Sequence, residues 1–166
     1  YNETDLNFNG RKIYLKGVDH HSGGLTQPFI HCQQAGRAFY FGTGETRDSV
    51  IDNFTIKDSR VEDTYGGAIL CESNSSPTIT NCVFQNNEVV DTNGSRDDED
   101  GGAICCYQSS PNITNCTFSG NTASYRGGAI WCADNSTPTI TDCIFSDNSA
   151  DYGGAICCYE SSPTIT

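Results

Sequence analysis

Apolar residues along this chain occur in short runs that alternate with small and polar residues. One run covers residues 66–71 and reads Gly-Gly-Ala-Ile-Leu-Cys, and another covers residues 78–84 and reads Thr-Ile-Thr-Asn-Cys-Val-Phe. Both runs contain side chains that favour strands, and no helical periodicity links them. The pattern therefore predicts short β-strands that are separated by turns.

These runs return at a regular interval, which is the strongest signal in the sequence. Each copy of the motif Gly-Gly-Ala-Ile is followed by a Ser-rich block that ends in Thr-Ile-Thr or Asn-Ile-Thr. Three of these blocks are followed directly by the pattern Asn/Asp-Cys-x-Phe, in which x is any residue. The motif starts at Gly66, Gly101, Gly127 and Gly153. The repeating unit has about 26 residues, and an insertion at 88–100 lengthens the first interval. Fainter copies of the runs lie at 36–41 and 50–56.

A unit of this length with two short strands predicts one coil of a parallel β-helix. Helical repeats need about 33 residues or more, and leucine-rich repeats need more Leu than this chain has. Coils of a β-helix stack about 4.8 Å apart, so that each strand pairs in register with its copy. We expect an all-β, right-handed solenoid of roughly five to six coils. Residues 1–65 would form irregular N-terminal coils and residues 66–166 regular ones.

Stacking predicts rows of identical side chains. The interior rows would hold Ile at 79, 113, 140 and 165, Cys at 82, 116 and 143, and Phe at 84, 118 and 145. Between the Ile and Cys rows, a bend with left-handed backbone would let both face inward, because Asn and Asp tolerate that conformation. The bend residues would be Asn53, Asn81, Asn115 and Asp142. A second turn ladder would consist of Asn87, Asn121 and Asn148. The Gly pairs would form the turn before the first strand.

The pairing of the Gly-Gly-Ala-Ile motif with Phe-x-x-Asn resembles the repeat of polymorphic outer-membrane proteins. The Phe-x-x-Asn copies are Phe84/Asn87, Phe118/Asn121 and Phe145/Asn148. The chain also looks like the wider group of pectate-lyase-like, right-handed β-helix proteins of cell surfaces. The resemblance covers residues 66–166 well and 36–65 loosely. It implies an extracellular stalk or passenger, often adhesive.

The sequence stops at Thr166, in the middle of a unit. Because bare coil edges template further pairing, we expect either a slice of a longer solenoid or a segment that stacks end to end in a filament.

Charge separates the early residues from the later ones. The chain has nine basic and 21 acidic residues, a net charge of −12. Residues 1–60 are neutral overall, so the whole excess lies in residues 61–166. Such a balance argues against nucleic-acid binding, because a phosphate backbone would be repelled. No run of 18 apolar residues occurs, so we expect no membrane span in this segment.

Ten cysteines favour disulfides and an oxidising compartment, since the paired spacing of a zinc site is missing. We expect bridges within one coil, at Cys71–Cys82, Cys106–Cys116 and Cys132–Cys143. Rows of free thiols and bridges between neighbouring coils are the alternatives. Two further cysteines, Cys105 and Cys157, would point outward. They would form vicinal disulfides with Cys106 and Cys158 or crosslinks to another chain.

Seven Asn-x-Ser/Thr sequons agree with a secreted protein. Asn53 and Asn115 fall in the predicted bend and would be engaged there. The predicted glycosylation sites are Asn74, Asn135 and Asn93, followed by Asn2 and Asn112.

The acidic insertion is a Ca²⁺ candidate formed by Asp97, Asp98, Glu99 and Asp100. It lacks the spacing of a dedicated calcium loop, so a solvated charge run is the favoured interpretation and no metal site or cofactor is predicted. Catalysis has little support, because the regular coils offer almost no basic residues beside their carboxylates and an acidic face repels polyanions. We therefore expect a protein that is not an enzyme.

Outward Thr pairs in the repeated Thr-Ile-Thr runs resemble the ranks of ice-binding proteins, although β-branched Thr also simply suits an exposed strand. The function predicted first is an extracellular structural or adhesive β-helix, disulfide-stapled and N-glycosylated. Its partners would be further copies, other extracellular proteins or glycans. The alternative is a β-helix that binds or cleaves carbohydrate, and ice binding comes last.

Overall fold

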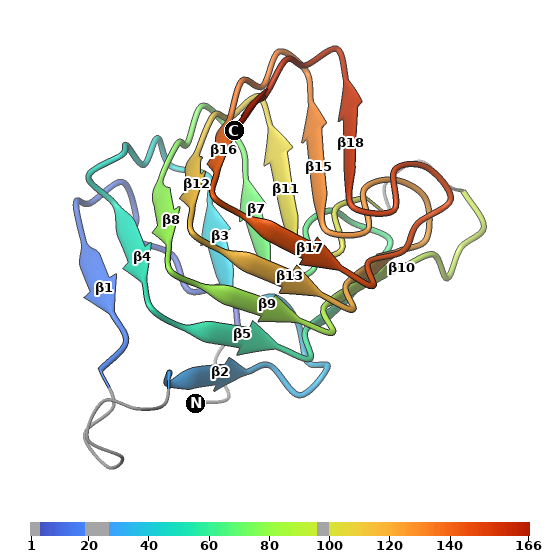
Figure 1. Ribbon diagram of the computed structural model, residues 1–166, viewed down its shortest axis with the longest axis horizontal. Coiled ribbons are helices and arrows are strands. Elements are labelled where there is room, and N and C mark those ends of the chain that lie inside the picture. Colours follow the sequence, from blue (N-terminus) through green and yellow to red (C-terminus); the bar gives the residue numbers. More distant parts are fainter. Residues whose placement is uncertain (1–3, 19–26, 96–99) are drawn as a thin grey trace.

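A computed structural model describes residues 4–18, 27–95 and 100–166 of the chain. Within these ranges the chain forms nineteen strands of two to four residues and no helix. All of the strand pairs are parallel, and they gather in four sheets (Figure 1). The short strands follow from the short β-prone runs, which small and polar turn residues interrupt.

The first sheet contains the Thr-rich strands. Its members are β1 (Tyr14–Lys16), β4 (Val50–Asp52), β8 (Thr78–Thr80), β12 (Asn112–Thr114), β16 (Thr139–Thr141) and β19 (Thr164–Ile165). The second sheet contains the Phe row. Its members are β2 (Phe29–His31), β5 (Thr55–Lys57), β9 (Val83–Gln85), β13 (Thr117–Ser119) and β17 (Ile144–Ser146).

The third sheet follows the Gly pairs. Its members are β3 (Phe39–Phe41), β7 (Ile69–Cys71), β11 (Ile104–Tyr107), β15 (Ile130–Ala133) and β18 (Ile156–Tyr159). The fourth sheet is short and contains β6 (Arg60–Glu62), β10 (Glu88–Val90) and β14 (Thr122–Ala123).

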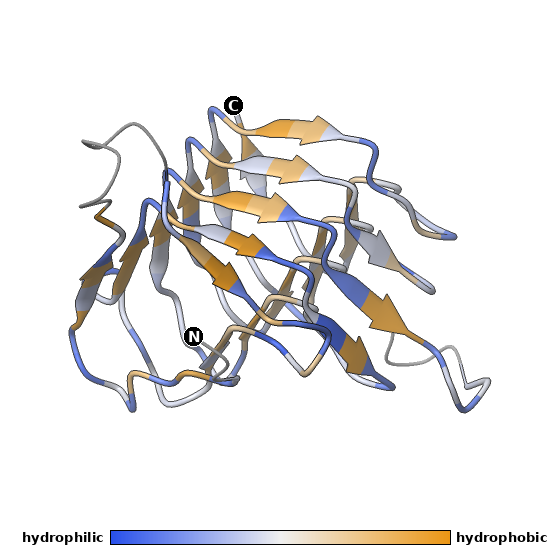
Figure 2. Cartoon of the chain, turned by 90° about the horizontal axis from the view of Figure 1, so that it is seen from below, coloured by the Kyte–Doolittle hydropathy of each residue, from blue (hydrophilic) through white to orange (hydrophobic). Residues whose placement is uncertain are grey.

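Each coil visits the sheets in the same order, so strands that are one unit apart in sequence lie side by side in space. For example, the chain runs through β7, β8, β9 and β10 before it returns to the third sheet at β11 (Figure 1). Neighbouring strands match in hydropathy as well as in register (Figure 2). The predicted all-β, parallel β-helical solenoid with coils of about 26 residues is thus confirmed.

Inward side chains fill the coil from end to end. Ile79, Ile113 and Ile140 are buried in successive coils, whereas Ile165 in the last strand is exposed. The rings of Phe84 and Phe118 stack at 4.8 Å, close to the spacing of neighbouring strands. Side chains of the same type therefore pack on one another along the axis of the solenoid.

The Gly pairs are required by the stacking of the coils. The first Gly of each pair has left-handed backbone, with φ between 63° and 73°. At Gly67, Gly102 and Gly128, a Cβ on the second Gly would collide with the backbone of the next coil: at Gly102 it would lie 2.2 Å from the carbonyl oxygen of Gly128. Only glycine fits at these positions.

Candidate functional site

A polar hollow of about 460 Å³ lies at the corner where the third sheet passes into the first. The chain turns there through left-handed residues, including Asn74, Gln108 and Asn135. Backbone bonds hold the corners together, since the Asn74 N–H donates to the Gln108 carbonyl at 3.1 Å. The lining residues are Asn74, Ser76, Gln108, Ser109, Ser110, Asp134 and Asn135. We call this hollow the corner groove.

Hydroxyl groups set the shape of the corner groove from below. The single O–H of Ser136 lies between two acceptors, the carbonyls of Ala133 at 2.6 Å and Cys106 at 2.9 Å, and its oxygen accepts the N–H of Ser109 at 3.1 Å. Ser110 accepts the Thr137 N–H at 2.9 Å. These hydroxyls satisfy backbone groups at the corner, and the amide residues Asn74, Gln108 and Asn135 line the groove beside them.

Two tyrosines of the third sheet pair with carboxylates, and one of these carboxylates, Asp134, lines the corner groove. Tyr107, next to Gln108 in the chain, bonds to Asp134, and this hydrogen bond raises the pKa of Tyr107. The Tyr40 hydroxyl donates to Glu72 at 2.6 Å, which raises the pKa of Tyr40. Both phenols therefore remain neutral donors.

Beside these tyrosines lies an apolar cluster that the sequence analysis missed, on the outer side of the third sheet. Tyr65 packs against Trp131 at 5.1 Å and against Tyr107 at 6.0 Å. Leu70, Cys105, Trp131 and Ala133 are buried in it. The available signal was the run of apolar residues at outward positions of one strand row, which indicates that other residues cover that face.

Cys105 corrects an expectation. It does lie on the side of the strand opposite the coil interior, in register with Leu70 and Trp131. However, it is 0% exposed, because the outer apolar cluster covers it. The prediction that Cys105 crosslinks to another chain is therefore wrong, whereas Cys157 is partly exposed.

The predicted sequons have different surroundings. Asn74 and Asn135 are exposed and line the corner groove, two coils apart. Asn93 is exposed in the loop after β10, and Asn112 is half-buried in β12. Asn2 lies outside the described residues. Glycosylation at these sites stays a prediction.

The structure places the predicted bend residues at one corner, all with left-handed backbone. Asn53, Asn81, Asn115 and Asp142 have φ between 51° and 65°. Their amides bond along the stack: Asn115 donates to Asn81 at 2.7 Å, and Asn81 donates to Asp52 at 2.7 Å. The two sequon asparagines of this row, Asn53 and Asn115, thus have amides that bond within the fold, Asn53 to the Gly17 carbonyl and Asn115 to Asn81.

The second asparagine row is hydrogen-bonded from coil to coil, with Asn87 and Asn121 fully buried and Asn148 half-buried. Asn87 donates to Asn121 at 2.9 Å, and Asn121 donates to Asn148 at 2.9 Å. Each amide also donates to a carbonyl of the preceding coil, for example Asn121 to Phe84 at 3.1 Å. Left-handed turns come just before this row, at Asn86, Gly120 and Asp147.

All ten cysteines are free thiols in the structure. Their contacts run along the stack rather than across one coil: the Cys116 thiol has hydrogen bonds with Cys82 and Cys143, and the Cys132 thiol with Cys106 and Cys158. The bridges predicted within one coil stay a prediction.

The Thr pairs of the first sheet are in register. Thr78 pairs with Asn112 and Thr80 with Thr114, and the rows continue through Thr139/Thr141 to β19. Upstream, Val50 and Asp52 interrupt them. Ice binding through these ranks stays a prediction, which a measurement of thermal hysteresis would test.

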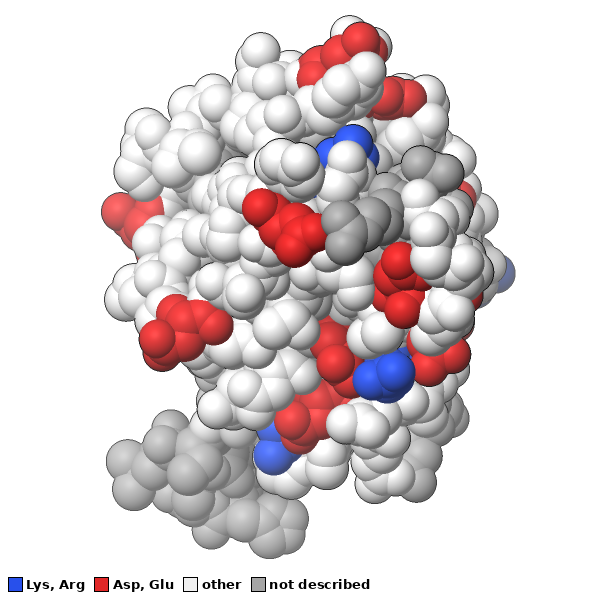
Figure 3. Space-filling model, turned by 90° about the vertical axis from the view of Figure 1, so that its right-hand side faces the viewer, with Lys and Arg blue, Asp and Glu red and all other residues white. Residues whose placement is uncertain are grey.

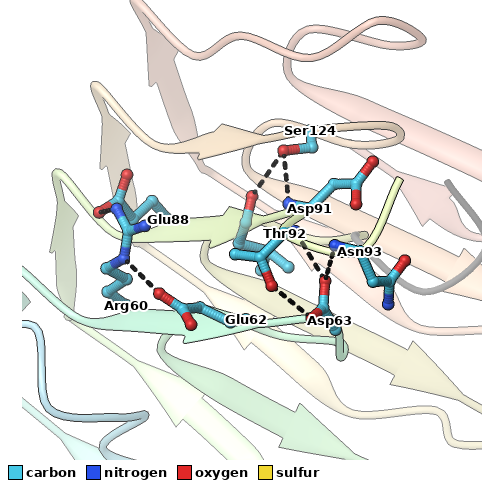
Figure 4. A network of polar contacts seen from close by, with 9 residues as sticks. Arg60, Glu62, Asp63, Glu88, Asp91, Thr92, Asn93 and Ser124 are labelled. Carbon is cyan, nitrogen blue, oxygen red and sulfur yellow. Dashed lines mark hydrogen bonds and ion pairs between the residues drawn. The ribbon is translucent and has the colours of Figure 1, made fainter. Parts of the chain in front are cut away.

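On the face that carries the fourth sheet and the loops beside it, acidic side chains outnumber basic ones (Figure 3). Many of them have structural partners. Asp63 accepts bonds from the Thr92 N–H at 2.8 Å and hydroxyl at 2.6 Å, which lower the pKa of Asp63, and Arg60 bridges Glu62 and Glu88 (Figure 4). These contacts order the start of the acidic insertion.

The predicted Ca²⁺ candidate is only partly described. Asp97, Asp98 and Glu99 lie outside the described residues. Asp100 is fully buried and lies 3.4 Å from Arg126. Across the described residues, no group of three or more His, Cys, Asp or Glu side chains is arranged to hold a metal ion.

Comparisons with known proteins identify a fold family. A family model described as "Right handed beta helix region" matches residues 30–166. The searches of curated proteins and of solved structures found no match. Among the described residues, no helix has the length and apolar character needed to cross a membrane.

Proposed function

The chain belongs to the family of right-handed β-helix proteins, and we propose that it is a rigid, non-enzymatic extracellular segment with a structural or adhesive role. The observation that carries this proposal is the continuity of the side-chain rows through the regular coils. The Phe84–Phe118 and Phe118–Phe145 rings stack at 4.8 and 4.9 Å, with interplanar angles of 6° and 5°. Repetition of one contact along an axis is typical of stalks and scaffolds.

The buried asparagine row supports rigidity by a second route. Bending the solenoid at this corner would lengthen the bonds that join Asn87, Asn121 and Asn148. Buried amides without partners are costly, at about 1–3 kcal/mol each. The row therefore resists separation of the coils at this corner, where apolar packing alone would not prevent the coils from sliding.

Cell location tests this proposal most directly. An antibody against the chain should label intact, unpermeabilised cells of the source organism or their surrounding matrix. Brief treatment of intact cells with a protease should remove the label. Labelling that appears only after permeabilisation, with a signal that survives external protease, would overturn the proposal.

A second candidate, carbohydrate binding, is favoured by the corner groove. Amide side chains from three successive coils line it, together with Ser hydroxyls and the Asp134 carboxylate. Amides, hydroxyls and carboxylates present both donors and acceptors, as the hydroxyl groups of a neutral sugar do. Tyr107, which bonds to the lining residue Asp134, adds a phenol group.

A glycan array followed by titration would test this second candidate. We expect binding of neutral oligosaccharides that Gln108→Ala weakens at least fivefold. Gln85→Ala is the matched control, because Gln85 is exposed on β9, in the second sheet. Equal losses from both variants, or no binding on the array, would contradict a glycan site at the corner.

A further inference from the structure

Seven of the ten cysteines form two straight rows along the solenoid. The strand row lies in the third sheet and contains Cys71, Cys106, Cys132 and Cys158. The corner row follows the first bend and contains Cys82, Cys116 and Cys143. Both rows contribute to the main apolar core, so the thiols face the interior of the coil.

Register brings successive thiols of the strand row together. Cys106 is the direct partner of Cys71 on one side and of Cys132 on the other, and Cys132 is the partner of Cys158. Side-chain hydrogen bonds join Cys106 to Cys132 and Cys132 to Cys158. From Cys106 onward, each thiol of the row is thus in contact with the thiol of the next coil, and Cys71 lies in register one coil before them.

The corner row has the same arrangement. Thr117 donates to the Cys82 carbonyl and Ile144 to the Cys116 carbonyl, both at 2.9 Å, which stacks the three cysteines in successive coils. The Cys116 thiol has hydrogen bonds with both neighbours. Its bond to Cys143 lowers the pKa of Cys143, which favours the thiolate form that attacks a disulfide.

Distance favours bridges along a row. Neighbouring parallel strands are about 4.8 Å apart, and disulfides span Cα separations of about 4.4–6.8 Å. By contrast, Cys105 and Cys157 have Trp131 between them on the outer side of the same sheet. Cysteines that stack directly and cysteines that do not can therefore be compared within the same chain.

We propose that oxidation staples neighbouring coils to each other, with each disulfide joining successive cysteines of one row. Two thiols lose two protons and two electrons and form one S–S bond. The electrons reduce a small disulfide such as oxidised glutathione to two thiols, through a mixed disulfide. Because the corner row has three members, one of its thiols remains free. This inference rests on the proposed extracellular function only for the natural source of the oxidant.

The positions of the basic residues make the test simple. After Lys57 the chain has only Arg60, Arg96 and Arg126, so trypsin releases peptides 61–96, 97–126 and 127–166. Every bridge within one coil, and every vicinal bridge, lies inside one of these peptides. A bridge from Cys71 or Cys82 to the next coil joins the first two peptides, and a bridge from Cys106 or Cys116 to Cys132 or Cys143 joins the last two.

The experiment is peptide mapping without reduction. The folded, reduced chain is oxidised with oxidised glutathione at pH 8, remaining thiols are alkylated, and the chain is denatured and digested. We expect peptide 97–126 to be linked covalently to 61–96 or to 127–166, and to be released by reduction. Unlinked peptides 61–96 and 97–126, each about 2 Da lighter for one internal bridge, would overturn the inference, and so would complete alkylation of all cysteines.

Variants assign the links. The double variant C106S/C116S should lose every link to peptide 97–126, whereas C105S, in the same peptide, should retain them. Loss of the links in C105S would contradict the row assignment. Native material separates this inference from the proposed function: links between coils that form in vitro but are missing in the native protein would exclude an oxidising location and leave the geometry of the rows intact.

Discussion

In the coils after Gly66 the stacked phenylalanine rings lie almost parallel, whereas in the first coils Phe8 meets its phenylalanine neighbours edge to face. Phe84 and Phe118 are inclined by 6°, but Phe8 meets Phe41 at 89°. The regular rings belong to one repeated position, while Phe8 comes from a segment with no counterpart in the later coils. Where the sequence repeats exactly, one contact is thus copied along the axis. Where the repeat is lost, each coil needs contacts of its own.

The polar corners differ in the same way. In the regular coils the buried asparagine row repeats one amide contact, and at its upstream end Ser59 takes the place of the amide and donates to Asn87 at 2.7 Å. Early in the chain, the carboxylate of Glu45 accepts the N–H groups of Gly10 and Thr43, at 2.8 and 3.0 Å. We therefore expect the regular coils to unfold together when a repeated contact is removed, and the early coils to unfold locally.

The largest expected effect comes from a methyl group at a repeated Gly. In Gly102→Ala the new Cβ would lie 2.2 Å from the Gly128 carbonyl oxygen and 2.4 Å from that of Thr122. Because both are backbone atoms, the coils must separate, and we expect a loss of at least about 4 kcal/mol in the free energy of unfolding, measured by urea denaturation.

Gly94→Ala is the control for this substitution. Gly94 also has positive φ, at 78°, but nothing lies within 4 Å of its Cβ position. Its cost should be confined to the backbone conformation, about 1 kcal/mol. Equal effects of the two variants would show that the close approach of the coils is not what requires glycine.

The next effect concerns the buried asparagine row. Asn121→Ala removes the acceptor for the Asn87 N–H and amide and the donor to Phe84 and Asn148. Leaving these buried groups unpaired should cost about 3 kcal/mol, measured by urea denaturation. Asn115→Gly is the matched control in the exposed row, since glycine keeps the left-handed backbone and only one exposed amide bond is lost. It should cost less than about 1 kcal/mol.

Much of the regular region could be predicted because each clue was repeated. The inward position of Ile79 and the bend at Asn81 follow from the spacing of the copies, and stacking then fixes their neighbours. A single sequence cannot show where loops fold back, so the burial of Cys105 beneath Tyr65 and Trp131 was missed. The corner groove was missed for a related reason, because its depth depends on how three turns lie against one another.

Acid should weaken the early coils before the regular ones. Although burial raises the pKa of Glu45, hydrogen bonds from Thr43 and Gly10 outweigh it and lower this pKa to about 2. In the unfolded chain the pKa is near 4.5. The carboxylate therefore stabilises the fold fully above pH about 4.5, and this contribution is lost as the pH falls toward 2.

The lost contribution should be about 1–2 kcal/mol, and hydrogen exchange at pH 5 and pH 3 can locate it. We expect protection at Gly10 and Thr43 to fall at pH 3, while amides in β8 and β12 keep theirs. Glu45→Gln should show the low-pH behaviour of these loops already at pH 5. A uniform loss of protection over all the coils would contradict the contrast between local and shared contacts.

The smallest expected effect concerns an ion pair in the early coils. It tests whether ion pairs stabilise residues 1–60, the part of the chain without net charge. Lys12 and Asp48 form an ion pair at 2.6 Å, but both side chains are more than half exposed. Water and salt screen such pairs, so Lys12→Ala should leave the midpoint of urea denaturation unchanged within error, at low salt and in 0.5 M NaCl alike. A clear, salt-dependent loss would mean that ion pairs organise the early coils. No loss would leave that task to the apolar contacts of Phe8, Phe39 and Phe41, and the basic residues would then serve mainly to limit the net charge of the chain.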